Sequence, residues 1–229
     1  MAALSPHHRY GFSVPSKHEV DPTWFNPDFE YPWELRQGDF TLAMQDVYDF
    51  FGDVNQMLRG RNLQRLDDML RPANMSGMIS DMLTDSLAKH SRALVNNNHH
   101  NGHPDLLSRG KYPGDSVESG EFGVEVKSTQ KAGGAVDTHG ARDQWMCVFV
   151  YSVDNETEPV DRRAPMTFRE IYLGKVERAD FRLNRRLSDT GTRTATLHAD
   201  GLKKLRPFWV YLDPDWATPT RGFLAKLRE

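Results

Sequence analysis

Two acidic residues and a lysine stand close together in the sequence between residues 103 and 129. Asp105 directly precedes two leucines, and Glu125 and Lys127 alternate with Val124 and Val126. Successive side chains of a β-strand point to opposite faces, so we expect Glu125 and Lys127 on one face and the valines on the other. The valine face would pack on helices, and the polar face would be free for chemistry.

The segment between these two stretches predicts that they fold back on each other. It contains Pro113-Gly114 and Gly120, residue types that favour turns. Two strands joined in this way would bring Asp105 close to Glu125. Three further acids of the same segment are expected in solvent, although one of them would replace Asp105 as a ligand if the strand register differs: Asp115, Glu118 and Glu121.

Two convergent carboxylates favour a hard divalent cation. The single cysteine, Cys147, lies in an apolar run, so it is expected in the core, and a cysteine-based metal site is excluded. Oxygen ligands suit Mg²⁺, with Mn²⁺ as a possible substitute. Such an ion can activate water and neutralise the charge that develops on a phosphodiester, and the Lys127 ammonium can assist the attacking water.

At these residues the sequence resembles the PD-(D/E)XK nuclease superfamily, and most of all type II restriction endonucleases. Pro104-Asp105 matches the PD and Glu125-Val126-Lys127 matches the (D/E)XK. The resemblance implies that Asp105 and Glu125 bind the metal and that Lys127 is the catalytic lysine. The order of the apolar segments, helices first and strands later, independently predicts an α/β (α+β) fold in which a mixed central β-sheet is flanked by helices. The resemblance implies the same fold, with a restriction-endonuclease-like core at about residues 76–212.

Further site residues are suggested around this motif. In many such nucleases an acid on the first core helix supplements the metal site; Asp81 and Asp85 are the candidates here, although the usual residue is Glu and surface acids are the alternative. Ser128 would contact DNA phosphate or simply satisfy the end of its strand. Gln144 would approach from the start of the next strand, and His103 stands in a loop expected near the scissile phosphate.

The positive charge of the chain is concentrated in one stretch. The formal net charge is −3, but residues 182–206 hold seven Lys or Arg against two Asp, a net of +5. A basic stretch of this kind can bind the phosphates of DNA, and arginine can also read guanine in the major groove. A solvated charged face is the alternative. The proposed DNA-binding residues are Arg182, Arg185, Arg186, Arg193, Lys203, Lys204 and Arg206.

The histidine-rich run at residues 95–103 suggests a competing class, the His-Asn-His nucleases. Their ββα motif needs a hairpin and a following helix to bring its members together. Here His99, His100 and His103 are crowded into one loop, and His139 is far along the chain. The spacing therefore argues against this class.

The remaining elements predict one domain at 39–229, preceded by an irregular, aromatic-rich arm at 1–38. Apolar spacing predicts a helix from Asp39 to about Leu58, with Asp39 or Thr41 as its cap. A short helix ended by Pro72 and a third helix capped by Ser76 would follow. Later apolar runs predict five strands, of which the one at Thr167 could also open a helix, and a brief helix precedes Pro207. The predicted strands begin at Asp105, Phe122, Trp145, Phe168 and Phe208.

These features together predict a Mg²⁺-dependent endonuclease that hydrolyses phosphodiesters of double-stranded DNA, as a sequence-specific type II restriction enzyme does. A PD-(D/E)XK nuclease of DNA repair, recombination or phage DNA processing is the first alternative. A non-catalytic DNA-binding module and a structural or interaction protein are the others. A homodimer, with contacts from the aromatic arm, is implied by resemblance only. No apolar run is long enough for a membrane span, so a cytoplasmic protein is expected.

Overall fold

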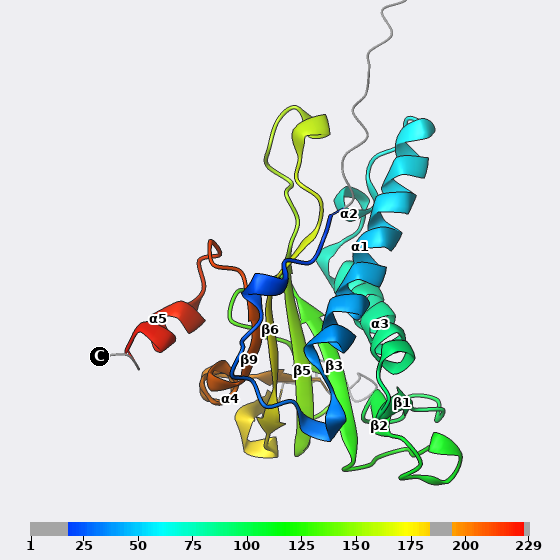
Figure 1. Cartoon of the computed structure of the whole chain (residues 1–229), viewed down its shortest axis with the longest axis vertical. Coiled ribbons are helices and arrows are strands. Elements are labelled where there is room, and N and C mark those ends of the chain that lie inside the picture. Colours follow the sequence, from blue (N-terminus) through cyan, green and yellow to red (C-terminus); the bar gives the residue numbers. More distant parts are fainter. Residues whose placement is uncertain (1–17, 184–193, 227–229) are drawn as a thin grey trace, which may run out of the picture.

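A six-stranded mixed β-sheet lies at the centre of the chain, between two layers (Figure 1). The computed structural model describes residues 18–183 and 194–226. The strand order is β1-β2-β3-β5-β6-β9, in which β3 and β5 are parallel and the other neighbours are antiparallel. The strands are β1 (Leu94–Asn96), β2 (Leu106–Ser108), β3 (Gly123–Thr129), β5 (Gln144–Ser152), β6 (Thr167–Val176) and β9 (Trp209–Leu212). The predicted α/β class with a mixed sheet is confirmed.

Two long helices, α1 (Gln37–Gly60) and α3 (Pro72–His90), cover one face of the sheet (Figure 1). Their buried residues recur at helical spacing, which is the pattern expected of helices that bury one stripe. Val124 and Val126 of β3 belong to the same hydrophobic cluster, so the predicted valine face is confirmed. The helical members of this cluster include Phe40, Met44, Val47, Phe51, Ile79, Leu83 and Leu87.

The other face of the sheet is covered by smaller pieces. A three-stranded sheet is formed by β4 (Asp137–Thr138), β8 (Ala195–Leu197) and β7 (Phe181–Leu183), and the short helix α4 (Ala199–Leu205) packs beside it. Apolar residues from both layers form a second cluster, including Met146 and Val148 of β5. Glu125 and Lys127 pair with these two residues in the parallel ladder. The polar pair therefore lies on the face opposite to the two long helices.

The predicted helix ends were wrong by a few residues. The cap of α1 is Arg36, and Asp39 is the third helical residue, whose side chain accepts the Arg36 N–H at 2.9 Å. Pro72 opens α3 and does not simply end the short α2 (Leu66–Met69). Proline is favoured in the first turn because its missing N–H has no partner there in any case. Ser76 is inside α3, where its hydroxyl meets the Tyr151 hydroxyl at 2.9 Å.

All five predicted strands are present, and the ambiguous segment at Thr167 is strand β6. The side chains of this segment pack alternately on the two faces of the sheet, and this packing outweighs the capping-box pattern, which would favour a helix. The predicted brief helix before Pro207 is α4, followed by a 3-10 turn at Arg206–Phe208. Four short strands were not predicted, because two or three residues carry no clear periodicity: β1, β4, β7 and β8.

The described part of the arm, residues 18–36, packs against the chain itself. It has no regular helix beyond two 3-10 turns, as predicted for an irregular segment. Phe25 forms a bridge with Tyr211 of β9, and the two rings are 4.9 Å apart. Trp33 stacks edge-on against Trp145 at 4.8 Å. These aromatic side chains therefore pack on the sheet of their own chain; the predicted role in dimer contacts stays a prediction.

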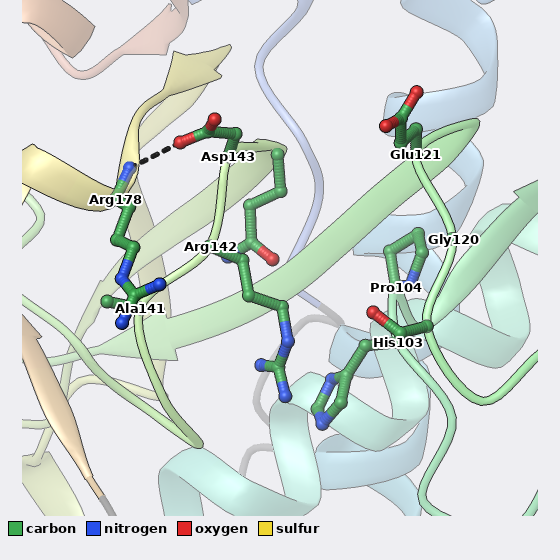
Figure 2. A pocket seen from close by; sticks show the side chains of 10 residues that line it. His103, Pro104, Gly120, Glu121, Ala141, Arg142, Asp143 and Arg178 are labelled. Carbon is green, nitrogen blue, oxygen red and sulfur yellow. Dashed lines mark hydrogen bonds between the residues drawn. The ribbon is translucent and has the colours of Figure 1, made fainter.

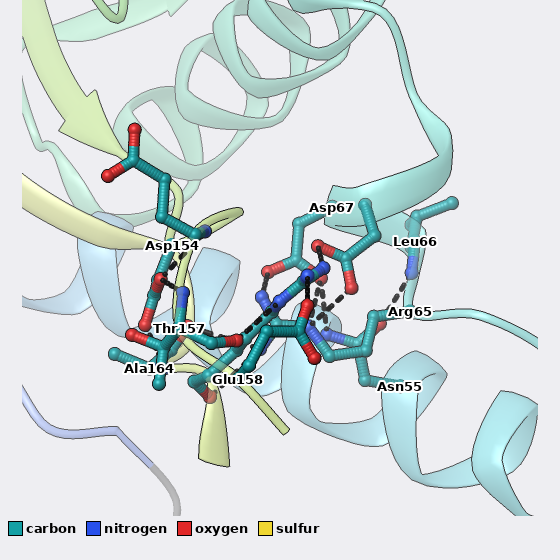
Figure 3. Close-up of polar contacts among 11 residues, drawn as sticks. Asn55, Arg65, Leu66, Asp67, Asp154, Thr157, Glu158 and Ala164 are labelled. Carbon is teal, nitrogen blue, oxygen red and sulfur yellow. Dashed lines mark hydrogen bonds and ion pairs between the residues drawn. The ribbon is translucent and has the colours of Figure 1, made fainter. Parts of the chain in front are cut away.

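The long connection between β5 and β6 is fixed to the helical layer by Arg65 (Figure 3). The Arg65 guanidinium donates to the carbonyl oxygens of Arg163 and Ala164 at 2.9 and 3.1 Å, and it also forms an ion pair with Asp67. Asp154 accepts three backbone N–H groups within the connection.

The described helices also include α5 (Pro219–Lys226), and none of them is long and apolar enough to span a bilayer.

The burial of the helical layer gives a stability prediction. Leu83 of α3 is fully buried, whereas Leu42 of α1 is 49% exposed. Leu83→Ala should lower the free energy of unfolding by about 2 to 5 kcal/mol, because it leaves a cavity in the core. The matched variant Leu42→Ala should change it by no more than about 0.5 kcal/mol. Urea denaturation followed by circular dichroism measures both, and equal losses would contradict the packing described.

Candidate functional site

The β2–β3 hairpin brings Asp105 next to the middle of β3. Leu106 pairs with Val124 in the antiparallel register, and Asp105 stands immediately before this pair. Its carboxylate Oδ2 accepts the backbone N–H of Val126 at 2.8 Å. The aspartate therefore takes a hydrogen bond from the strand that carries Glu125 and Lys127.

Lys127 joins the two acids. Its Nζ lies 3.1 Å from Asp105 Oδ2 and 2.7 Å from Glu125 Oε1, and it also donates to the Val126 carbonyl at 3.0 Å. Glu125 is only 1% exposed, so its charge needs a partner at close range. We call Asp105, Glu125 and Lys127 the carboxylate cluster. The structure brings together the three residues that the sequence motif singles out.

His103 is a fourth member of this neighbourhood. Its Nδ1 lies 3.3 Å from Glu125 Oε2. Ligand atoms of His103, Asp105 and Glu125 all lie within 4.8 Å of one another, and no other group of three His, Cys, Asp or Glu residues within 18–183 and 194–226 does so. The sequence predicted only that His103 lies in a loop near the site, because the isolated bridge between His103 and Ser119 has no sequence signature.

The loop that carries His103 and Asp105 is held by Asn97. Its side-chain amide donates to the carbonyls of Pro104 and Val117 at 3.1 and 2.8 Å, and its side-chain oxygen accepts the Val117 N–H. Gly123 allows the close approach of the two strands: a Cβ there would lie 2.0 Å from the Leu106 carbonyl oxygen. The Asn97 hydrogen bonds and the close approach of the strands at Gly123 together place Asp105 relative to β3.

The charges of the cluster stabilise one another. Burial alone would raise the pKa of Glu125, but the hydrogen bond with His103 and the charge of Lys127 lower it to about 2. Burial would lower the pKa of Lys127, but Glu125 and Asp105 raise it. Burial and the charge of Glu125 raise the pKa of Asp105, against the influence of Lys127. Glu125 is thus ionised and Lys127 protonated, and Asp105 is the acid that more readily holds a proton.

Asp81 and Asp85 of α3 lie beside the cluster without joining it. They line a pocket of about 370 Å³ together with Asp105, Asn96 and His99, which we call the aspartate pocket. Asp85 accepts a hydrogen bond from the Asn96 side chain at 2.8 Å. Neither aspartate belongs to the group within 4.8 Å, so a role as a supplementary ligand stays a prediction.

Ser128 and Gln144 are placed on different sides of the sheet. The Ser128 hydroxyl donates to the Ser76 carbonyl at 2.8 Å, and its backbone N–H donates to the Ser80 hydroxyl at 2.9 Å. Ser128 therefore anchors α3 to β3 and faces away from Glu125 and Lys127, which favours its structural reading over DNA contact. Gln144 lines a pocket together with His103, next to the cluster.

The described members of the basic stretch are partly engaged within the chain. Arg182 is exposed on β7. Lys203 pairs with Asp200, and Lys204 pairs with Glu177 and Asp180. Arg206 is half-buried, and its Nε has no hydrogen-bond partner in the part of the chain that the structure describes. The other three proposed DNA contacts lie outside the described residues: Arg185, Arg186 and Arg193.

The alternative histidines and acids are not gathered into a second site. His99 contacts the His100 carbonyl and lines the aspartate pocket. Asp115 caps its own turn by accepting the Gly110 N–H at 2.8 Å. Glu118 and Glu121 are exposed, as predicted, and Cys147 is buried, as predicted.

The donor set fits a divalent cation. Two carboxylates supply the oxygen ligands that Mg²⁺ and Mn²⁺ prefer, and an imidazole nitrogen is a further ligand that Mn²⁺ and zinc accept. Glu125 is already ionised, and a proton on Asp105 would leave as a metal binds. Lys127 would remain close to the bound ion as a positive group.

Comparisons of the chain with models of protein families, with curated proteins and with solved structures found no match.

The site geometry gives a metal-binding prediction. The protein should bind Mn²⁺, and Asp105→Asn or Glu125→Gln should weaken binding by about tenfold or more, because each removes one anionic ligand. Isothermal titration calorimetry with Mn²⁺, Mg²⁺ and Zn²⁺ measures the affinities. The exposed acid Glu118 supplies the control, Glu118→Gln, which should bind as the unmodified protein does. Equal affinity of all four proteins would contradict the site.

Proposed function

We propose that this chain is a metal-dependent nuclease that hydrolyses phosphodiester bonds of DNA. The observation that carries the proposal is the convergence of Asp105, Glu125 and Lys127, with Nζ within 3.1 Å of both carboxylates. Two acids and a protonated lysine on paired strands form the combination that the PD-(D/E)XK resemblance implies. Mg²⁺ is the proposed cofactor, with Mn²⁺ as a substitute.

Each residue of the cluster has a distinct role in this reaction. A bound divalent ion would supply Lewis-acid activation of water and of the phosphate. Asp105 and Glu125 would hold that ion, and the Glu125 carboxylate is available without loss of a proton. Lys127 stays protonated beside the acids, so it can orient the attacking water and stabilise the negative charge of the transition state. His103 orients Glu125 through their contact at 3.3 Å.

The choice among nucleases rests on resemblance. A sequence-specific type II restriction enzyme, acting as a homodimer on double-stranded DNA, is the reading that the motif order favours. A nuclease of repair, recombination or phage DNA processing would use the same cluster. Cleavage of unmodified plasmid DNA into discrete fragments favours the first, and smears or nicks at branched structures favour the second.

Substitution of the cluster tests the catalytic role directly. Lys127→Met should reduce the rate of plasmid cleavage in Mg²⁺ by about 100-fold or more, because it removes the group that faces the developing charge. Asp105→Asn should have a comparable effect, and EDTA should abolish cleavage by the unmodified protein. Agarose-gel assays at matched protein concentrations measure these rates.

A matched lysine far from the cluster serves as control. Lys226 is exposed in the last turn of α5, on the opposite side of the sheet from β1 and β2 (Figure 1). Lys226→Met should cut as the unmodified protein does. Binding of DNA without cleavage in Mg²⁺ or Mn²⁺ would support the non-catalytic DNA-binding module instead. Cleavage that survives Lys127→Met unchanged would contradict the assignment of the cluster.

A further inference from the structure

A second pocket adjoins the carboxylate cluster on the other side of His103. It has a volume of about 310 Å³, and its lining includes His103, Gln144 and two arginines, Arg142 and Arg178. We call it the arginine pocket. His103 belongs to both places, because its ring lines the pocket while its Nδ1 meets Glu125 at 3.3 Å. Only the His103 side chain would therefore separate a ligand in the arginine pocket from the carboxylate cluster.

The two arginines reach the pocket from different elements. Arg142 precedes β5, and Arg178 follows β6, the antiparallel neighbour of β5. Figure 2 shows the Arg142 guanidinium extending toward the His103 ring, and the Arg178 side chain near Ala141, on the side of Arg142 away from His103. Arg142 is held by a hydrogen bond from its Nη1 to the His139 carbonyl at 2.5 Å. The guanidinium is thus positioned without using a carboxylate.

Neither arginine is neutralised by the described chain. Within residues 18–183 and 194–226, Arg142 and Arg178 form no ion pair with any Asp or Glu. Asp143 and Glu121 also line the pocket, but Asp143 accepts the backbone N–H of Arg178 at 2.6 Å, and both carboxylates lie away from the Arg142 guanidinium in Figure 2. Next to His103, the pocket is therefore lined by an Arg142 guanidinium that pairs with no carboxylate of the described residues.

We propose that the arginine pocket binds a backbone phosphate of the DNA strand that is cut, next to the phosphate held at the carboxylate cluster. Two arginines that line one cavity are suited to a phosphate, because each guanidinium presents several N–H donors in a planar fork. Because His103 borders both the carboxylate cluster and the arginine pocket, the two phosphates would be neighbours. The inference rests on the proposed nuclease function, and it assigns to Arg142 and Arg178 the alignment of the substrate strand.

Removal of both arginines tests this role. The protein is prepared unmodified, as Arg142→Gln/Arg178→Gln, and as the control Arg59→Gln/Arg61→Gln, whose arginines are exposed at the far end of α1. Fluorescence anisotropy with a short labelled duplex in Ca²⁺ gives Kd over a range of salt concentrations. The pocket variant should bind about tenfold more weakly at low salt. The slope of log affinity against log salt should fall by about one, as expected for one lost phosphate contact.

The control variant should retain both the affinity and the slope of the unmodified protein. If the unmodified protein cuts DNA and the pocket variant matches it in affinity and slope, the phosphate subsite is wrong and the nuclease function stands. If the unmodified protein neither binds nor cuts DNA, the proposed function fails and so does a DNA phosphate in this pocket. In that case, calorimetric titration with inorganic phosphate tests whether the pocket binds a free phosphate instead of DNA. Saturable binding that the pocket variant loses and the control variant keeps would show such an anion site.

Discussion

A carboxylate that is buried in a β-sheet needs a charged partner, and the contact between Glu125 and Lys127 meets this requirement. Glu125 is 1% exposed, and Lys127 Nζ lies 2.7 Å from its Oε1. Removing one member of such a pair leaves an uncompensated charge in a region of low dielectric. Because the two side chains share a face of β3 with valines opposite, a shift of one residue in register would bury both charges under the helices. The pair therefore fixes how β3 sits in the sheet.

The rest of the site follows from the position of β3. On one face, Ser128 bonds to Ser76 and Ser80 and sets α3 against the strand. At its edge, the β2 hairpin delivers Asp105 to the Val126 N–H. β3 is thus paired on both sides, by β2 and β5, and lies between α3 and the loop that carries Asp105. A site built on such elements holds its side chains more precisely than one built on loops alone.

Local patterns predicted the central part of this arrangement. The alternation of Val124, Glu125, Val126 and Lys127 gave the faces of β3, and Pro113-Gly114 indicated the turn that returns Asp105 to it. The sheet class and the long helices followed from apolar spacing. The position of His103 could not be predicted, because it depends on a single bridge to Ser119 across the loop. The convergence of Arg142 and Arg178 depends on the pairing of β5 with β6, which no short pattern encodes.

A crystal structure with Mn²⁺ tests the central claim most directly, because the anomalous signal of the ion locates it without reference to activity. The ion should lie between Asp105 and Glu125 at distances typical of carboxylate ligands, about 2.0 to 2.3 Å. Lys127 should remain protonated beside it, displaced from its present position between the acids. An ion bound elsewhere, or a carboxylate cluster that keeps its Lys127 contacts and takes no ion at saturating Mn²⁺, would contradict a metal-dependent site.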